Sequence, residues 1–199
     1  MVFAANTGSV LTGCSDNKSN SYTPMVSEAG GGGFYCVNAT AGVTTVTVVG
    51  GAHLCVLVCE ESGLAAFDAN AAILVNASAN PELSNAITPG SSTAIGYTYF
   101  INDTSSFGTT TWTFNNNGGS TWGGITGTGI TGGSVSSAGN CGVFAGRDSI
   151  ASTASTFASV NVGATRSEHV GFITFTQSAG GGASGPAPMY YQRKVLYFI

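Results

Sequence analysis

The residues best suited to chemistry are few, and the closest group of them lies in "AHLCVLVC", residues 52–59. His53, Cys55 and Cys59 are residue types that bind zinc. The apolar, β-branched character of the segment predicts an extended strand. At about 3.3 Å per residue, Cys55 and Cys59 would then lie roughly 13 Å apart. One zinc ion needs all its ligands within about 2.3 Å, so we expect no metal site and no cofactor.

Nucleophilic catalysis would need a general base, and the chain has two histidines, His53 and His169. Glu168 is beside His169, but neighbouring residues of a strand point to opposite faces. For the same reason, Glu60 and Glu61 would point to opposite faces of a strand and could not act together as the two carboxylates of a glycosidase. A solvated turn is the simpler interpretation of these two residues. No Gly-x-Ser-x-Gly string is present. We therefore expect a protein that is not an enzyme, with a small hydrolase, its triad assembled from distant residues, as the least favoured alternative.

A third group of interest is the glycine-rich tract that contains Gly127-Thr-Gly-Ile-Thr-Gly132. Its spacing matches a dinucleotide-binding fingerprint, but that motif needs a strand before it and a helix after it, and the flanking sequence has neither pattern. We interpret the tract as a loop. Trp122, within "GGSTWGGI", could stack on a sugar ring, whereas Trp112 alternates with Phe114 as a core residue would. A carbohydrate- or receptor-binding module, with a glycan bound at Trp122, is therefore the main alternative function.

Composition determines which elements could position such residues. Ser, Thr, Asn and Gly together account for 91 of 199 residues, and only 7% of the residues are charged. This mixture disfavours helices, because Thr is β-branched and Gly, Ser and Asn weaken a helix. The hydrophobic fraction of 43% excludes a disordered chain. We expect an all-β fold, an antiparallel β-sandwich of jelly-roll type with long Gly-rich loops.

Charge and hydropathy exclude further classes. Five basic residues and a net charge of −4 argue against nucleic-acid binding, which needs a basic surface. No apolar run approaches the roughly 18 residues of a membrane span, and the first ten residues do not look like a secretory signal. We therefore expect no membrane partner and synthesis in the cytosol. The odd number of cysteines favours reduced, buried thiols over disulfides; these are Cys14, Cys36, Cys55, Cys59 and Cys141.

Hydrophobic periodicity predicts short strands separated by turns. They are expected at 34–38, 43–49, 52–59, 94–101, 109–115, 141–146, 155–162 and 169–176. Gly50-Gly51 predicts a hairpin that joins 43–49 to 52–59. Segment 52–59 is apolar on both faces, as a central strand between two layers would be. Two segments are ambiguous between helix and strand: 64–87, with a short helix capped at Asn80, and 148–158, with a cap at Asp148.

The domain organisation follows from this pass along the chain. Residues 1–33 are polar and turn-rich and are expected to form an N-terminal arm or irregular segment, followed by one β-sandwich domain over 34–199. The last strand, "MYYQRKVLYFI" (189–199), is so apolar that it would promote aggregation unless it paired within its sheet or with a partner subunit. We expect a subunit interface there, formed by Tyr190, Tyr191, Val195, Leu196, Tyr197, Phe198 and Ile199.

Three loops, "EAGGGGF", "GGITGTGITGGS" and "AGGGASGPAP", occur in this charge-poor chain that starts at Met1. In these features and in overall composition it resembles structural proteins of tailed bacteriophage particles, such as capsid decoration proteins and tail-fibre or spike modules. The resemblance implies a β-sandwich subunit, often trimeric, that is made in the host cytoplasm and built into the virion beside other virion proteins. A surface with few charges also avoids the cost of desolvating ions at subunit contacts. We expect a non-enzymatic component that stabilises or decorates a capsid or tail as a homo-oligomer.

Overall fold

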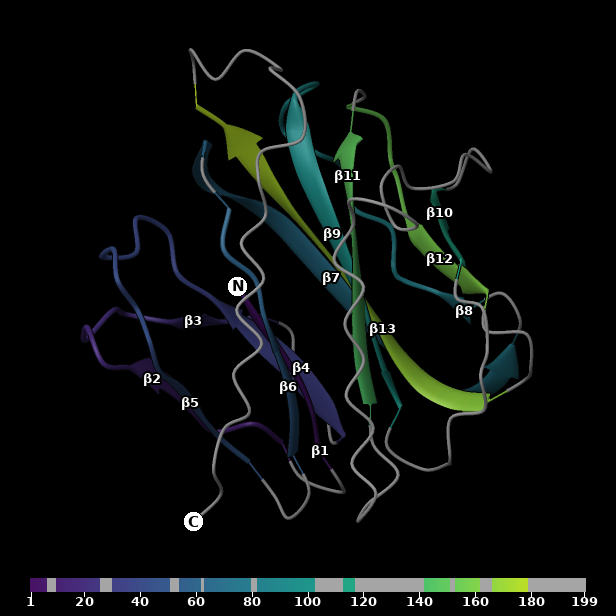
Figure 1. Cartoon of the computed structure of the whole chain (residues 1–199). Helices are drawn as coiled ribbons and strands as arrows, with labels where there is room; N and C mark the ends of the chain where they lie inside the picture. The colour runs from purple at the N-terminus through teal and green to yellow at the C-terminus, as the bar shows by residue number, and fades with distance from the viewer. Residues whose placement is uncertain are drawn as a thin grey trace.

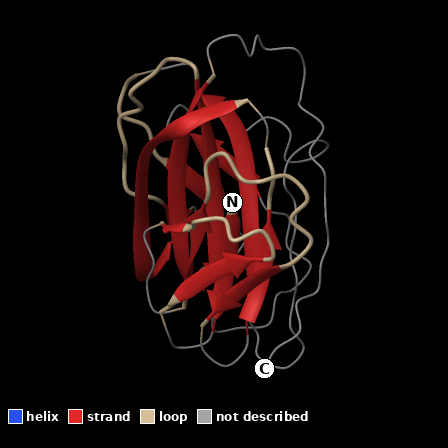
Figure 2. Cartoon of the chain, turned by 90° about the vertical axis from the view of Figure 1, so that its left-hand side faces the viewer, coloured by secondary structure: helices blue, strands red, loops and turns tan. Residues whose placement is uncertain are grey.

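Every regular element that the structure describes is a β-strand, and every strand pair is antiparallel. The computed structural model describes residues 1–6, 10–25, 30–50, 54–61, 63–79, 82–102, 113–116, 142–150, 153–161 and 166–178. The expected all-β class is confirmed for these residues, and Figure 2 shows strands and loops throughout them. None of them forms a helix that could cross a membrane.

The strands form four antiparallel sheets, which lie beside one another in Figure 1. The N-terminal sheet has the order β3-β4-β1-β6, with β3 Thr23–Pro24, β4 Gly31–Tyr35, β1 Val2–Asn6 and β6 Leu54–Val58. The long sheet has the order β11-β9-β13-β7, with β11 Gly142–Ile150, β9 Ala94–Asn102, β13 Arg166–Gln177 and β7 Leu64–Ala79. The outer pair is β2 (Gly13–Asp16) with β5 (Val46–Val49); the three-stranded sheet is β10 (Thr113–Asn116), β12 (Ala158–Asn161) and β8 (Glu82–Leu83).

The N-terminal sheet and the long sheet share one cluster of buried side chains. The cluster contains Phe3, Ala5, Met25, Leu57 and Cys59 from the first, and Ile95, Tyr97, Tyr99, Ile173 and Phe175 from the second. The Phe3 and Tyr99 rings stack across the two sheets with centroids 5.2 Å apart. Ile95, Tyr97 and Tyr99 enter this cluster from one face of β9, because a strand places every second side chain on the same face, which confirms the strand predicted at 94–101.

The other face of the N-terminal sheet is also covered. Val2 and Ala4 of β1, with Phe34 of β4, pack against Val46 and Val48 of the outer pair. Burial on both faces requires strands that are apolar at every position, which explains "VFAA" in β1 and "CVLV" in β6. The prediction of a central strand between two layers at 52–59 is confirmed in part: β6 is covered on both faces, but among the described residues it is the edge strand of its sheet.

The chain start corrects one expectation. Residues 2–6, assigned from their sequence to an irregular arm, form β1, which lies between β4 and β6 and pairs with both. Its side chains from Val2 to Ala5 are fully buried. Four apolar or small residues suffice for an inner strand, although they are too few for a clear periodic pattern. The segment 1–33 therefore supplies part of the core.

The predicted hairpin across Gly50-Gly51 is wrong. β5 pairs with β2 in the outer pair, whereas β6 pairs with β1 in the N-terminal sheet. β5 alternates between buried and exposed residues, as a covering strand should, while β6 is apolar on both faces. The two strands therefore belong to different layers even though only residues 50–53 separate them in the sequence.

Both segments left open between helix and strand contain strands. β7 runs from Leu64 to Ala79, Glu82 and Leu83 form β8 in place of the helix expected after Asn80, and Asp148 lies within β11. Thr and β-branched partners in β13 favour extended pairing of β7 over the weak helical tendency of the Ala-rich run. The other expected strands are present with shifted ends; most of 109–115 and residues 51–53 lie outside the described residues.

Candidate functional site

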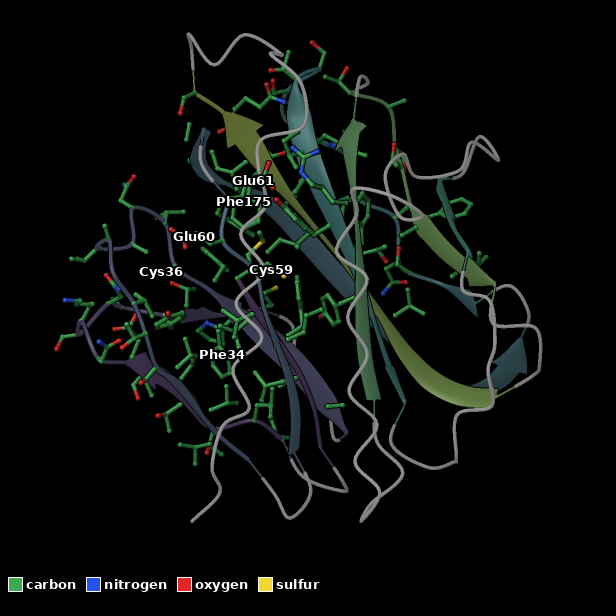
Figure 3. The ribbon with its side chains drawn as sticks, in the orientation of Figure 1. Phe34, Cys36, Cys59, Glu60, Glu61 and Phe175 are labelled. Atoms are coloured by element: carbon green, nitrogen blue, oxygen red, sulfur yellow. The ribbon has the colours of Figure 1, made fainter. Side chains whose placement is uncertain are left out.

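The described residues enclose a cavity of about 570 Å³ at the end of the N-terminal sheet where β1 begins and β6 ends. We call it the N-terminal cavity. Segment 36–45 forms one wall, and Gly63, Leu64 and Phe175 of the long-sheet side form part of another. Cys36, Cys59, Glu60, Glu61 and Phe175 can be followed around it in Figure 3. The remaining lining residues are Met1, Val2, Tyr22, Val37, Asn38, Ala39, Thr40, Val43, Thr44, Thr45, Val46 and Val58.

Side chains of the neighbouring turn hold the wall formed by segment 36–45. Asn17 Oδ1 accepts hydrogen bonds from the backbone N–H groups of Thr44 (2.9 Å) and Thr45 (3.1 Å). Asn20 Oδ1 accepts one from the N–H of Thr40 (2.8 Å). Asn side chains commonly satisfy backbone groups of irregular segments in this way. The wall is therefore built before any ligand arrives.

Asp16 organises the turn that carries these asparagines. Its carboxylate accepts hydrogen bonds from the N–H groups of Lys18 (2.8 Å) and Asn20 (3.1 Å), from Asn20 Nδ2 (2.7 Å) and from the Tyr22 hydroxyl (2.9 Å). Desolvation raises the pKa of Asp16, but these hydrogen bonds outweigh it and lower the pKa to about 2. Burial and the bond to Asp16 raise the pKa of Tyr22, so its hydroxyl stays protonated and remains a donor.

The floor of the cavity is apolar and contains thiols. The Met1 amino group donates to the Cys59 carbonyl oxygen (2.6 Å), and the Cys59 N–H donates to the Met1 carbonyl oxygen (2.8 Å). Burial lowers the pKa of that amino group. Cys36 and Cys59 of the cavity and Cys14 of β2, which does not line it, are free thiols, and burial raises the pKa of Cys14 and of Cys59 to about 12. Because the thiolate is the reactive form, these groups are poor nucleophiles.

The upper rim carries two carboxylates with different surroundings. Glu60 is exposed, whereas the side chain of Glu61 is only 3% exposed and forms an ion pair with Arg147 of β11. Arg147 Nε lies 2.9 Å from each Glu61 oxygen, and its Nη2 donates to Oε1. The expectation of a solvated Glu60-Glu61 turn is therefore correct for Glu60 and wrong for Glu61.

The structure brings together few of the residues singled out from the sequence. Cys59 lies in the cavity floor, while His53 is outside the described residues and Cys55 is described only by its backbone in β6. Within the described part of the chain, no group of three or more His, Cys, Asp and Glu residues is placed to hold a metal ion. Glu168 and His169 are consecutive residues of β13.

Other predicted positions stay predictions. Trp122, on which the carbohydrate-binding alternative depends, lies outside the described residues, as do the glycine tract around Gly127 and the interface expected over 189–199. The structural evidence on function therefore comes from the N-terminal cavity and from the described surface.

Comparisons with known proteins give no match of any kind. No family model matches the chain, no curated protein is recognisably similar to it, and no solved structure matches its fold. The described residues themselves are therefore the basis for assigning a function.

Sequence reasoning missed the two networks that shape the cavity. Arg147 and Glu61 are 86 residues apart, and the side chains of Asn17 and Asn20 hold a segment that is 20 or more residues away. One signal was available: Asp16, Asn17 and Asn20 form a cluster of turn-forming residues between strands. That cluster predicts a turn, but nothing local indicates which segment the turn supports.

Proposed function

We propose that the protein is a non-enzymatic structural subunit of a bacteriophage particle, made in the host cytoplasm and incorporated into the virion. In this role it stabilises or decorates the capsid or tail by packing against copies of itself and other virion proteins. A trimer is the oligomer that its resemblance to phage structural proteins implies. The finer architecture that we propose is an antiparallel β-sandwich of jelly-roll type, supported by the core that two four-stranded sheets share.

The observation that carries this proposal is a surface poor in free charge. Of the few charged groups, Asp16 is bonded within its own turn and Glu61 to Arg147. Asp68 accepts hydrogen bonds from the N–H of Gly90 (3.0 Å) and from the Thr174 hydroxyl (3.0 Å). Large apolar side chains are exposed instead, namely Val10, Val37, Val49, Phe67 and Leu83. Such a surface can be covered by another subunit with little cost of desolvating ions.

Removal of residues 189–199 tests the proposal. We expect the full chain to sediment as an oligomer at micromolar concentration and the shortened chain to sediment as a monomer, because the apolar C-terminal segment supplies the contact. A Tyr197→Ser/Phe198→Ser variant keeps the length and should show the same loss. Far-ultraviolet circular dichroism should show unchanged strand content in both. Oligomers of unchanged size in both variants would disprove the assigned contact.

A further inference from the structure

We propose that the N-terminal cavity is the receptor for residues 189–199 of a neighbouring copy of the chain. This inference rests on the proposed function, and it names the surface that the C-terminal segment would occupy. It depends on three properties: the charge of the cavity rim, the apolar character of its walls, and the position at which the chain leaves the long sheet.

The cavity offers an apolar interior below an acidic rim. Its walls include Val43, Val58 and Phe175, and its rim carries Glu60 and Glu61. No lysine or arginine is among the described residues that line it. Its volume of about 570 Å³ falls within the range of roughly 300–1,000 Å³ that is usual for ligand pockets. An occupant should therefore combine a few apolar side chains with positive charge.

The segment 189–199 has this composition. Arg193 and Lys194 are two of the five basic residues of the chain, and Val195, Leu196 and Tyr197 follow them directly. Glu60, at the exposed rim, is the carboxylate that these cations would meet, since Glu61 is already bound to Arg147, and the apolar run would enter the cavity below it. Of the other three basic residues, Arg147 is already paired with Glu61. Charge complementarity sets the register of such a contact, while apolar burial supplies most of its affinity.

The chain leaves the long sheet close to the cavity, and the proposed homo-oligomer is the reason for assigning the segment to a neighbouring copy. The N–H of Ser178 donates to the carbonyl oxygen of Gly63 (2.9 Å), and Gly63 lines the cavity, so the chain leaves the sheet at the cavity edge. Residues 179–188 can span at most about 36 Å when extended. Pro186 and Pro188 favour extended backbone just before the segment, so this linker is long enough to reach the cavity of an adjacent subunit.

The wall of the cavity is already ordered before the segment binds. The bonds from Thr40, Thr44 and Thr45 to Asn20 and Asn17 hold segment 36–45 in place within the isolated chain. A receptor that is already ordered loses little conformational entropy on binding. The incoming segment then bears most of the ordering cost.

A charge exchange in the full chain tests the assignment. Glu60→Lys and Lys194→Glu should each raise the dissociation constant of the oligomer about fivefold, because each replaces an attraction at the rim by a repulsion. The two together should restore it to within about twofold of the original value. Arg166→Glu is the matched control: it makes the same change of charge at the far end of β13 and should not rescue Glu60→Lys. If the double variant assembles no better than the single variants, the proposal is overturned.

Disulfide trapping decides which copy supplies the segment. Val195, Leu196 and Tyr197 are replaced singly by cysteine, and the assembled protein is treated with diamide, which accepts the two hydrogens lost by each thiol pair. We expect a covalent dimer that requires Cys36, a half-buried cavity residue, and that disappears in a Cys36→Ser background. A disulfide within one chain, or none involving Cys36 in any variant, overturns the proposal. If removal of 189–199 still abolishes assembly, the proposed function survives that outcome.

Discussion

The missing side chain of Gly171 determines where the Tyr99 ring lies. The two residues face each other in the pairing of β13 with β9. A Cβ added to Gly171 would lie 1.8 Å from Cζ of Tyr99 and 2.1 Å from Cε1, which is far inside van der Waals contact. The ring therefore covers the bare backbone of Gly171 and stacks on Phe3 of the N-terminal sheet.

Gly171→Ala should consequently destabilise the fold by about 1–3 kcal/mol, the usual cost of forcing extra volume into a packed core. Urea unfolding measures the change. Gly13→Ala is the matched control, since its Cβ would meet the nearest atoms of Val49 at 3.9 Å, an ordinary contact, and it should change stability by less than about 0.5 kcal/mol. Equal effects of the two substitutions would contradict the packing described for Tyr99.

The ion pair between Arg147 and Glu61 joins β11 to the cavity rim, and the Glu61 carboxylate in it is nearly buried. Arg147→Met would leave Glu61 charged and without its partner. Breaking a buried pair costs about 3–5 kcal/mol, and the 22% exposure of Arg147 reduces this to about 2–3 kcal/mol.

Thermal or urea unfolding measures the loss of stability expected for Arg147→Met. Lys18→Met, at an exposed position, is the control and should be nearly neutral. The combined variant Glu61→Leu/Arg147→Met should recover part of the loss, since it removes the unpaired charge. A fully stable Arg147→Met protein would show that the pair contributes nothing.

Sequence reasoning at the residue scale finds residue types but not their partners. The apolar sequence around Cys59 predicts a buried thiol, and Cys59 is buried in the structure. Glu61, by contrast, looks identical to Glu60, and only the distant Arg147 makes their environments different. The contact joins elements 86 residues apart, and no local pattern carries that information.

At the scale of elements, the turn from Asp16 to Tyr22 supports the cavity wall, and its stability should depend on pH. The pKa of Asp16 is lowered to about 2, against an ordinary value of about 3.9. A lowered carboxyl pKa means that the stabilisation is complete above about pH 4 and is lost as the pH falls through about 2.

Hydrogen exchange of the Lys18 and Asn20 amides, which donate to Asp16, measures this effect. Their protection in the original protein should fall between about pH 4 and pH 2, after correction for intrinsic exchange. In Asp16→Ala it should be low and flat over that window. The exposed neighbour Ser15→Ala should behave like the original protein. The same pH profile in Asp16→Ala would show that another group controls the turn.

The strands themselves follow from sequence more readily than their partners do. Alternation predicted β9 and the end of β13, and the two apolar faces of residues 52–59 predicted a strand covered by two layers. Pairing was harder to predict: adjacency favoured a hairpin of β5 with β6, but their burial patterns place them in different layers. β1 escaped notice because four small or apolar residues at the chain start show no period, although burial on both faces explains their composition.

At the scale of the whole molecule, the described residues combine a layered all-β core with a surface that carries few free charges. The described sheets bury their apolar side chains between layers, and Asp16, Asp68, Glu61 and Arg147 are bound within the chain. The exposed remainder combines uncharged polar groups with large apolar residues such as Val49 and Phe67. Association with other subunits would cover the apolar part of that surface.

Sedimentation equilibrium of the full chain is the most direct test of this central claim. We expect one assembled species at micromolar concentration, with a mass that is a whole-number multiple of the chain mass and that hardly changes with moderate salt, because apolar burial supplies most of the affinity. A single species with the mass of one chain at every concentration would contradict it.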